Sequence, residues 1–130
     1  MPILLDTSVA VALLEGAPAL IERRRDQNDT AYLSAVSRVE LIPGLYVEGK
    51  LRRDRADRLT SFLGEVEELP FDQLEVEAYE RIIAATGFSR RLVVDRMIGA
   101  TALANDLTLA TLNSRDFRDI PGLMIEDWSA

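Results

Sequence analysis

Four acidic residues, far apart along the chain, have the chemistry needed to bind a metal ion: Asp6, Glu40, Asp95 and Asp116. Each of them stands next to apolar residues, where an unpaired carboxylate would be costly to bury. Bound cations commonly hold such carboxylates in place, and a site made only of carboxylate oxygens suits a hard ion such as Mg²⁺ or Mn²⁺. If the four side chains converge in space, they form an oxygen-only metal site.

Two residue types are missing from the sequence, and their absence narrows the chemistry further. The chain of 130 residues contains no cysteine and no histidine. This excludes disulfides, thiol catalysis, Ser-His-Asp triads and metal sites with Cys or His ligands. The net charge of −7 argues against a protein that coats nucleic acid by charge alone. Acid–base chemistry near neutral pH would therefore fall to carboxylates, Tyr, Lys or metal-bound water.

Length and composition favour one domain. The chain is long enough for a single hydrophobic core and too short for two, and 48 % of its residues are hydrophobic. We therefore expect a single domain over residues 1–130. The N-terminus lacks the basic and apolar regions of a signal peptide, and no apolar run approaches the ~20 residues of a membrane span. These features predict a cytoplasmic protein without a membrane contact.

Short apolar runs alternate with amphipathic segments along the whole chain. Strands are expected at residues 3–5, 30–33, 68–71, 107–111 and 124–125. Helices are expected at residues 9–14, 19–26, from 34 to a break at Pro43-Gly44, 52–68, 72–86 and 95–103. This alternation predicts an α/β fold with a mainly parallel sheet covered by helices on both faces.

The order of the elements gives the four acids a reason to meet. Ligands of such sheets bind beyond the carboxyl ends of the strands. Asp6 follows the first strand, and Asp116 follows the strand at 107–111. Glu40 and Asp95 lie near the beginnings of helices that start from the same edge of the sheet.

Each acid also has a structural explanation when it is considered alone. Asp6 can cap the next helix, although the two hydroxyl residues that follow it can fill that role. The segment 37–40 matches a capping box, which explains Glu40 without catalysis. Asp95 at a helix start interacts favourably with the helix dipole, and Asp116 can be an ordinary turn residue. The argument for a site therefore depends on the whole set.

Four segments together resemble the signatures of PIN domains, and most closely those of the VapC-type toxins of bacterial type II toxin–antitoxin pairs. The segments are residues 3–8, 34–41, 95–104 and 111–117, and the tail at 120–128 is also similar to that subgroup. The similarity covers the whole chain in the right order and length. It implies a PIN-like, three-layer α/β/α fold around a central, mainly parallel sheet.

The resemblance also implies a function and partners. It implies an endoribonuclease that depends on Mg²⁺, with Mn²⁺ able to substitute, and that hydrolyses RNA phosphodiester bonds. A VapB-type antitoxin encoded alongside would neutralise it, docking in an apolar groove near the helices of residues 9–14 and 38–63. Relatives are commonly homodimers, so a homodimer is expected here as well.

The same resemblance implies roles for individual residues. The four acids would form the catalytic and metal-binding pocket, with Asp6 and Asp95 as the principal ligands and the other two completing it. Ser8 would steady Asp6, and Asn113 would hydrogen-bond a ligand or a metal-bound water. Arginines flank the motifs and can either grip phosphates or form salt bridges; they are Arg90, Arg91, Arg96, Arg115 and Arg118.

Three other interpretations fit parts of the sequence. A phosphoryl-accepting receiver or a haloacid-type phosphatase also combines an acidic cluster with Mg²⁺, but both need a lysine beside the phosphate. The only lysine, Lys50, is expected within a helix away from the motifs. The main alternative is a catalytically silent PIN domain that binds RNA or protein, and the presence of all four acids argues against it. The same nuclease chemistry directed at DNA is a third possibility.

Overall fold

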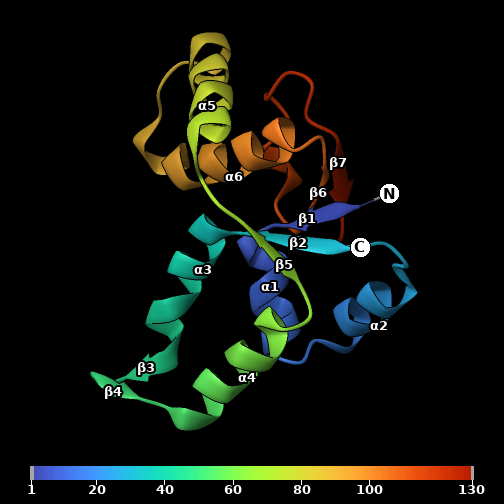
Figure 1. The fold of residues 1–130 in the computed structure, drawn as a ribbon, viewed down its shortest axis with the longest axis vertical. Helices are drawn as coiled ribbons and strands as arrows, with labels where there is room; N and C mark the ends of the chain where they lie inside the picture. Colours follow the sequence, from blue (N-terminus) through green and yellow to red (C-terminus); the bar gives the residue numbers. More distant parts are fainter. Residues whose placement is uncertain (1, 130) are drawn as a thin grey trace.

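A five-stranded sheet forms the centre of the molecule (Figure 1). A computed structural model describes residues 2–129, so the expected domain bounds at 1 and 130 lie outside the described residues. The strands, in their order across the sheet, are β5 (Glu67–Leu69), β2 (Ala31–Ser34), β1 (Ile3–Leu5), β6 (Thr108–Thr111) and β7 (Ile125–Asp127). Every neighbouring pair of these strands is parallel. The predicted mainly parallel sheet is therefore confirmed.

Helices cover both faces of this sheet. They are α1 (Thr7–Leu14), α2 (Pro18–Asp26), α3 (Ala35–Leu41), α4 (Arg53–Leu63), α5 (Gln73–Thr86) and α6 (Val93–Ala104). Figure 1 shows α5 and α6 on one side of the sheet and α1, α2 and α4 on the other. This arrangement confirms the three-layer α/β/α architecture. Among the described residues, no helix combines the length and the apolar character needed to cross a membrane.

The central strand β1 contributes to the core on both faces of the sheet. Ile3 and Leu5 pack in one apolar cluster with residues of α1 and α4, whereas Leu4 packs in the other with residues of α5 and α6. All three side chains are at most 1 % exposed. Successive residues of a strand point to opposite faces, so a strand buried on both faces must be apolar throughout. The run Ile-Leu-Leu meets this requirement, and the residue after it, Asp6, lies at the carboxyl end of the strand.

The helix α6 packs unusually close to the chain that follows β6. A Cβ atom on Gly99 would lie 2.8 Å from the Cδ1 atom of Ile120, which is too short for any ordinary contact. A larger residue here would force the end of the Ile120 side chain to shift, so glycine allows this turn of α6 to pack closely against the segment after β6. The contact fixes the distance between α6, which carries Asp95, and the segment that carries Asp116.

The middle of the chain differs from the sequence-based expectation. The helix predicted over 52–68 begins at Arg53 and ends at Leu63. A small antiparallel hairpin precedes it, formed by β3 (Tyr46–Val47) and β4 (Lys50–Leu51), and it was not predicted. Lys50 thus lies in a hairpin and not in a helix. The hairpin turn uses positive φ angles at Glu48 and Gly49, the backbone geometry of tight two-residue turns.

The break predicted at Pro43-Gly44 is confirmed. The helix α3 ends at Leu41, and a 3₁₀ helix, η1 (Ile42–Leu45), follows it. Proline lacks the backbone N–H that an α-helix needs, so the chain leaves the helical path there. The result is a short α3, whose last turn carries Glu40.

Candidate active site

Asp6 occupies the position where the central strand ends and α1 begins. Its backbone is extended, and its Oδ1 atom accepts a hydrogen bond of 2.9 Å from the N–H of Thr7. Asp6 itself is therefore the N-cap of α1, and the expectation that Thr7 or Ser8 would take the cap was wrong. The side chain is almost fully enclosed, because the residue is only 3 % exposed.

Two hydroxyl groups fix the other oxygen of Asp6. The hydroxyls of Ser8 and Thr111 donate to Oδ2 at 2.7 and 2.8 Å. Each hydroxyl in turn accepts a backbone N–H, from Leu112 at 3.2 Å and from Asn113 at 2.9 Å respectively. A hydroxyl that accepts one hydrogen bond has its own hydrogen free to donate, so both contacts orient the carboxylate. Oδ1 accepts only the N–H of Thr7 among the described contacts and keeps a lone pair for a cation.

Thr111 begins the segment 111–117, but no role was predicted for its side chain, although the pairing of the strands indicates one. β6 pairs with β1 in the register Leu5 to Ala110, so the next residues, Asp6 and Thr111, leave the sheet side by side. Alignment of two neighbouring strands can thus reveal a hydroxyl residue at the end of one strand that lies beside an acid at the end of the other.

Glu40 reaches the same edge of the sheet from α3. The N-cap of α3 is Ser34, whose Oγ accepts the N–H of Val36 at 3.0 Å, so the capping box expected at 37–40 is wrong. Instead, Thr7 donates its hydroxyl hydrogen to Oε1 of Glu40 at 2.6 Å. Ser37 lies 2.8 Å from the same Thr7 oxygen and therefore donates to it. Glu40 is exposed, and this contact directs it toward Asp6.

Asp95 interacts electrostatically with each of the other three acids. It is the third residue of α6 and is partly buried. Burial, and then the negative charges of Asp6, Asp116 and Glu40, raise the pKa of Asp95 from 3.8 to about 6. Arg91 acts in the opposite direction. The four acids therefore interact as one acid cluster, and we use this name for Asp6, Glu40, Asp95 and Asp116.

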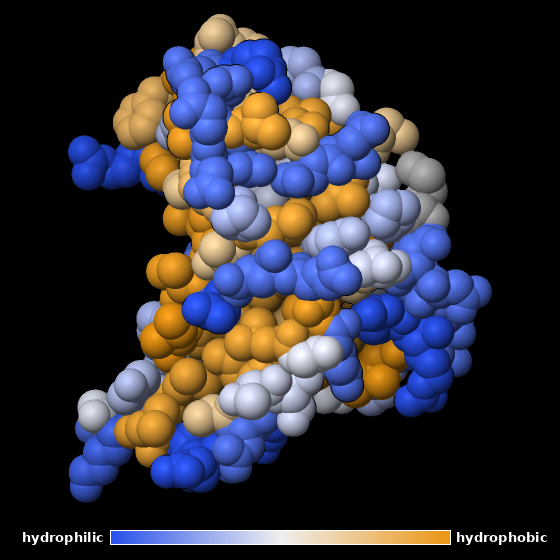
Figure 2. All heavy atoms as spheres, viewed as in Figure 1, coloured by the Kyte–Doolittle hydropathy of each residue, from blue (hydrophilic) through white to orange (hydrophobic). Residues whose placement is uncertain are grey.

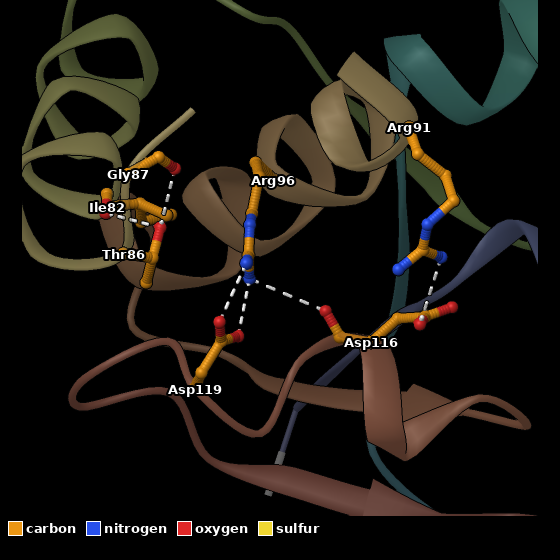
Figure 3. A network of polar contacts seen from close by, with 7 residues as sticks. All are labelled: Ile82, Thr86, Gly87, Arg91, Arg96, Asp116 and Asp119. Atoms are coloured by element: carbon orange, nitrogen blue, oxygen red, sulfur yellow. Dashed lines mark hydrogen bonds and ion pairs between the residues drawn. The ribbon is translucent and has the colours of Figure 1, made fainter. Parts of the chain in front are cut away.

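Asp116 comes from a short 3₁₀ helix, η3 (Ser114–Asp116), just after β6. Its side chain is 29 % exposed, and its Oδ1 atom lies 3.6 Å from Nη1 of Arg91 (Figure 3). Its backbone carbonyl accepts a long contact of 3.5 Å from Arg96. Both arginines belong to the segment around the start of α6, so they connect Asp116 to the element that carries Asp95.

Arg96 forms a buried anchor beside the acid cluster. Its guanidinium donates two hydrogen bonds to the carboxylate of Asp119, at 2.7 and 2.8 Å, and its side chain is 4 % exposed (Figure 3). These bonds raise the pKa of Arg96 further and hold the pKa of Asp119 below its ordinary value. Of the two roles open to Arg96, the salt bridge is the one observed.

Asn113 stands at the rim of the site. Its backbone N–H supports Thr111, as described above, and its side chain is exposed just before η3. This location is open to an incoming ligand.

The donor atoms of the acid cluster fit a hard divalent ion. Residues 2–129 contain no group of three or more carboxylates that already stand at the spacing of a finished metal site. The cluster nevertheless brings together four carboxylates, and burial followed by the charges of the other three raises the pKa of Asp95. Carboxylate and hydroxyl oxygens suit Mg²⁺ or Mn²⁺, which keep several water ligands when they bind to one or two carboxylates.

Comparison with known proteins agrees with this fold. The model of the PIN domain family matches residues 3–123. Ribonuclease VapC1 of Rickettsia felis is 30 % identical over 96 % of this chain and 95 % of its own length. The tRNA(fMet)-specific endonuclease VapC of Shigella flexneri is 29 % identical over 97 % of both chains.

Solved structures show the same relationship. A chain in the structure of VapBC2 from Rickettsia felis, bound to a DNA fragment from its promoter, has a TM-score of 0.85 and 25 % identity. The match covers 98 % of this chain and 99 % of that one. A chain of the DNA-bound VapBC from Salmonella typhimurium has a TM-score of 0.84 and covers 98 % of both chains. The chain therefore belongs to the PIN domain family, in the branch that holds the VapC ribonucleases.

Proposed function

We propose that this protein is a divalent-metal-dependent endoribonuclease and the toxin of a toxin–antitoxin pair. The observation that carries the proposal is the convergence of four acids from distant segments at the carboxyl ends of the strands. Thr7, next to Asp6, hydrogen-bonds Glu40, and burial followed by the charges of the other three acids raises the pKa of Asp95. Four carboxylates at one edge of a parallel sheet repel one another unless a cation lies among them. The named relatives cleave RNA, and this site offers the chemistry that RNA hydrolysis requires.

Each residue of the site has a role in the proposed reaction. A bound Mg²⁺ or Mn²⁺ supplies an activated water near neutral pH and stabilises charge on the phosphate. Asp6 and Asp95 would hold the ion, and Glu40 and Asp116 would complete its surroundings. Ser8 and Thr111 keep the Asp6 carboxylate in one orientation, so its spare lone pair points in a fixed direction.

A VapB-type antitoxin is the proposed inhibitor, and a groove next to the site is its proposed docking place. The groove has a volume of ≈ 340 Å³ and is lined by residues of α1, α3, η1 and α4. Apolar side chains such as Val11, Leu41 and Leu59 alternate there with charged ones, which include Arg55 and Arg58. Figure 2 shows apolar surface between α3 and α4 in the lower half of the molecule, framed by hydrophilic atoms. Glu40 also lines this groove, so an antitoxin segment bound there would lie beside the acid cluster.

The test is cleavage of RNA by the purified chain, freed of antitoxin. The panel contains a tRNA mixture with initiator tRNA, a messenger transcript and a DNA of matching sequence, each with Mg²⁺, Mn²⁺ or EDTA. We expect RNA cleavage that EDTA stops and that Asp6→Asn and Asp95→Asn each abolish. Asp106→Asn is the matched control, because this exposed acid follows the far end of α6 and has a backbone conformation that asparagine also accepts.

Two results would count against the proposal. Cleavage that both site variants retain in full would show that the acid cluster is not the catalytic centre. Normal RNA binding without cleavage under any metal condition would favour the silent PIN domain, which binds RNA without hydrolysing it.

A further inference from the structure

The loop at residues 87–92, between α5 and α6, presents an aromatic ring and two guanidinium groups to solvent. Gly87 has φ +81° and ψ 167°, a backbone conformation that other residues rarely adopt, and it turns the chain out of α5. The next residue, Phe88, is 66 % exposed. Arg90 and Arg91 begin the 3₁₀ helix η2 (Arg90–Leu92) and are exposed as well.

This composition is unusual for a loop in such an acidic chain. Most phenylalanine side chains are buried, because removal of the ring from water is favourable. An exposed phenylalanine lacks this favourable free energy of burial. The net charge is −7, yet no Asp or Glu occurs between residues 81 and 94. The loop is therefore a local positive region with an exposed ring, next to a strongly negative site.

The same loop borders the acid cluster. The Nη1 atom of Arg91 lies 3.6 Å from Oδ1 of Asp116, one of the four acids (Figure 3). Phe88 is three residues before Arg91, so their Cα atoms are at most about 11 Å apart. A ring at that distance can contact a nucleotide next to the one whose phosphate lies at the acid cluster.

Arg91 is available for such a contact. Its side chain is 74 % exposed, and its separation from Asp116 is long for an ion pair. Exposed pairs of this kind contribute little to stability, because water screens them. Arg91 can thus exchange its contact with Asp116 for one with a phosphate, which carries a full negative charge.

We propose that Phe88, Arg90 and Arg91 form a binding surface for single-stranded RNA that places the scissile phosphate at the acid cluster. The inference rests on the proposed function. Phe88 stacks on an unpaired base, and the two arginines contact the flanking phosphates. Proteins that bind single-stranded nucleic acid combine these two elements, an aromatic stacking surface and a positive groove.

Charge and position favour RNA over a protein as the occupant of this surface. The proposed antitoxin groove is lined by α1, α3 and α4 and does not include any residue of the loop. Guanidinium groups bind phosphates with two parallel hydrogen bonds, and a polyanion needs positive contacts to approach a site with four carboxylates. The loop supplies those contacts at the border of the site.

The test measures binding of a short fluorescein-labelled RNA of randomised sequence by anisotropy, in EDTA, to the full chain freed of antitoxin. The variants are Phe88→Ala, Phe88→Trp, and Arg90→Gln combined with Arg91→Gln. Met124→Ala controls for loss of an exposed apolar side chain, since Met124 is 64 % exposed and lies in the loop before β7. Arg25→Gln controls for loss of an exposed charge on α2.

We expect Phe88→Ala to weaken RNA binding about 5- to 150-fold, the range for one stacked base. Phe88→Trp keeps a stacking surface and should stay within about twofold of the native chain. The double arginine variant should reduce the slope of log K against log salt by roughly 1.4, because two phosphate contacts are lost. In cleavage assays with Mg²⁺, Phe88→Ala should raise KM more than it lowers kcat.

The outcomes separate the two proposals. If the native chain neither binds nor cleaves any RNA, the proposed function fails and this inference fails with it. If the native chain cleaves RNA but Phe88→Ala binds as tightly as Met124→Ala, only the inference is overturned. If the loop variants bind RNA normally and instead escape inhibition by the antitoxin, the loop is a protein contact and the inference is likewise overturned.

Discussion

The carboxylate of Asp95 combines two conditions that oppose each other: it is partly buried, and it faces three other acids. Its raised pKa means that, between about pH 3.8 and 6, the folded chain holds a proton that the unfolded chain has released. Stability without metal therefore falls as the pH rises through this window and stays lower above it. A bound cation that neutralises the charge of Asp95, or a mutation that removes it, should restore the stability that the folded chain loses above this pH window.

Replacement of Asp95 by asparagine should accordingly stabilise the metal-free chain at pH 7. The pKa shift corresponds to roughly 3 kcal/mol, which screening of this partly exposed group reduces to about 1–2 kcal/mol. The gain should nearly vanish at pH 4, where Asp95 is protonated in the folded chain. Urea unfolding of both proteins at the two pH values measures this difference. An equal gain at both would mean that charge repulsion is not the cause.

A second prediction concerns the hydroxyl of Thr111. Thr111→Val keeps the shape of the side chain but removes the hydrogen bond to Asp6 and the acceptor for the N–H of Asn113. We expect Mn²⁺ affinity to fall by about 10- to 100-fold, as is typical when a residue that orients a metal ligand is lost. Calorimetric titration with Mn²⁺ measures the affinity independently of cleavage.

Thr101→Val is the matched control for this experiment. Thr101 is fully buried like Thr111, but its hydroxyl donates to the backbone of Met97 within α6. If both valine variants bind Mn²⁺ equally well, the orientation of Asp6 does not depend on the hydroxyl of Thr111.

At the scale of elements, the distance between α6 and the turn after β6 decides whether Asp95 and Asp116 face each other. Gly99→Ala forces a methyl group against Ile120 and should cost about 1–3 kcal/mol, the usual range for overpacking. Gly44→Ala is the control, because a Cβ there meets nothing within 4 Å. Thermal and urea unfolding compare the two, and equal stabilities would show that α6 can move without cost.

Several elements could be predicted from the sequence because their signals are local. The run Ile3-Leu4-Leu5 has the continuous apolar character of a strand buried on both faces, and it forms the central strand. The spacing of Asp72 and Glu75 is that of a capping box, and the box is present at the start of α5, where the sequence predicted a helix to begin. In both cases neighbouring residues alone determine the structure.

Other features depend on contacts that a local pattern cannot reveal. Leu74 stands four positions before the buried Ala78, a spacing that predicts the inner face of α5, yet its side chain is 63 % exposed. Ser37 matched a cap by spacing, yet its partner is Thr7, 30 positions away. The order of the four acids and the contact of Ser8 with Asp6 could be predicted. The contacts of Thr111 with Asp6 and of Thr7 with Glu40 could not, because these hydrogen bonds join elements that are far apart in the sequence.

For the whole molecule, metal binding and folding should be linked. A cation that binds the acid cluster neutralises repulsion between carboxylates that is present in the folded chain and absent from the unfolded chain. Mn²⁺ at about 100 times its dissociation constant should therefore stabilise the protein by roughly 2.7 kcal/mol. Melting temperatures with Mn²⁺ and with EDTA measure this effect.

Two variants define the specificity of that effect. Asp6→Asn should abolish most of the shift, since Asp6 is the proposed principal ligand, and Asp106→Asn should leave it unchanged. Equal shifts in both variants would indicate that Mn²⁺ binds elsewhere on this acidic chain, whose net charge is −7.

The hydrogen bond between Thr111 and Asp6 joins residues 105 positions apart, and this has a consequence for synthesis on the ribosome. The strand that carries Thr111 inserts beside β1 only after almost the whole chain has been translated. A nascent chain that ends before residue 108 contains three of the four acids but lacks the strand that orients the first of them. Hydrolysis at the proposed catalytic centre should therefore begin only when translation is nearly complete, because closure of such a long loop must precede assembly of the acid cluster.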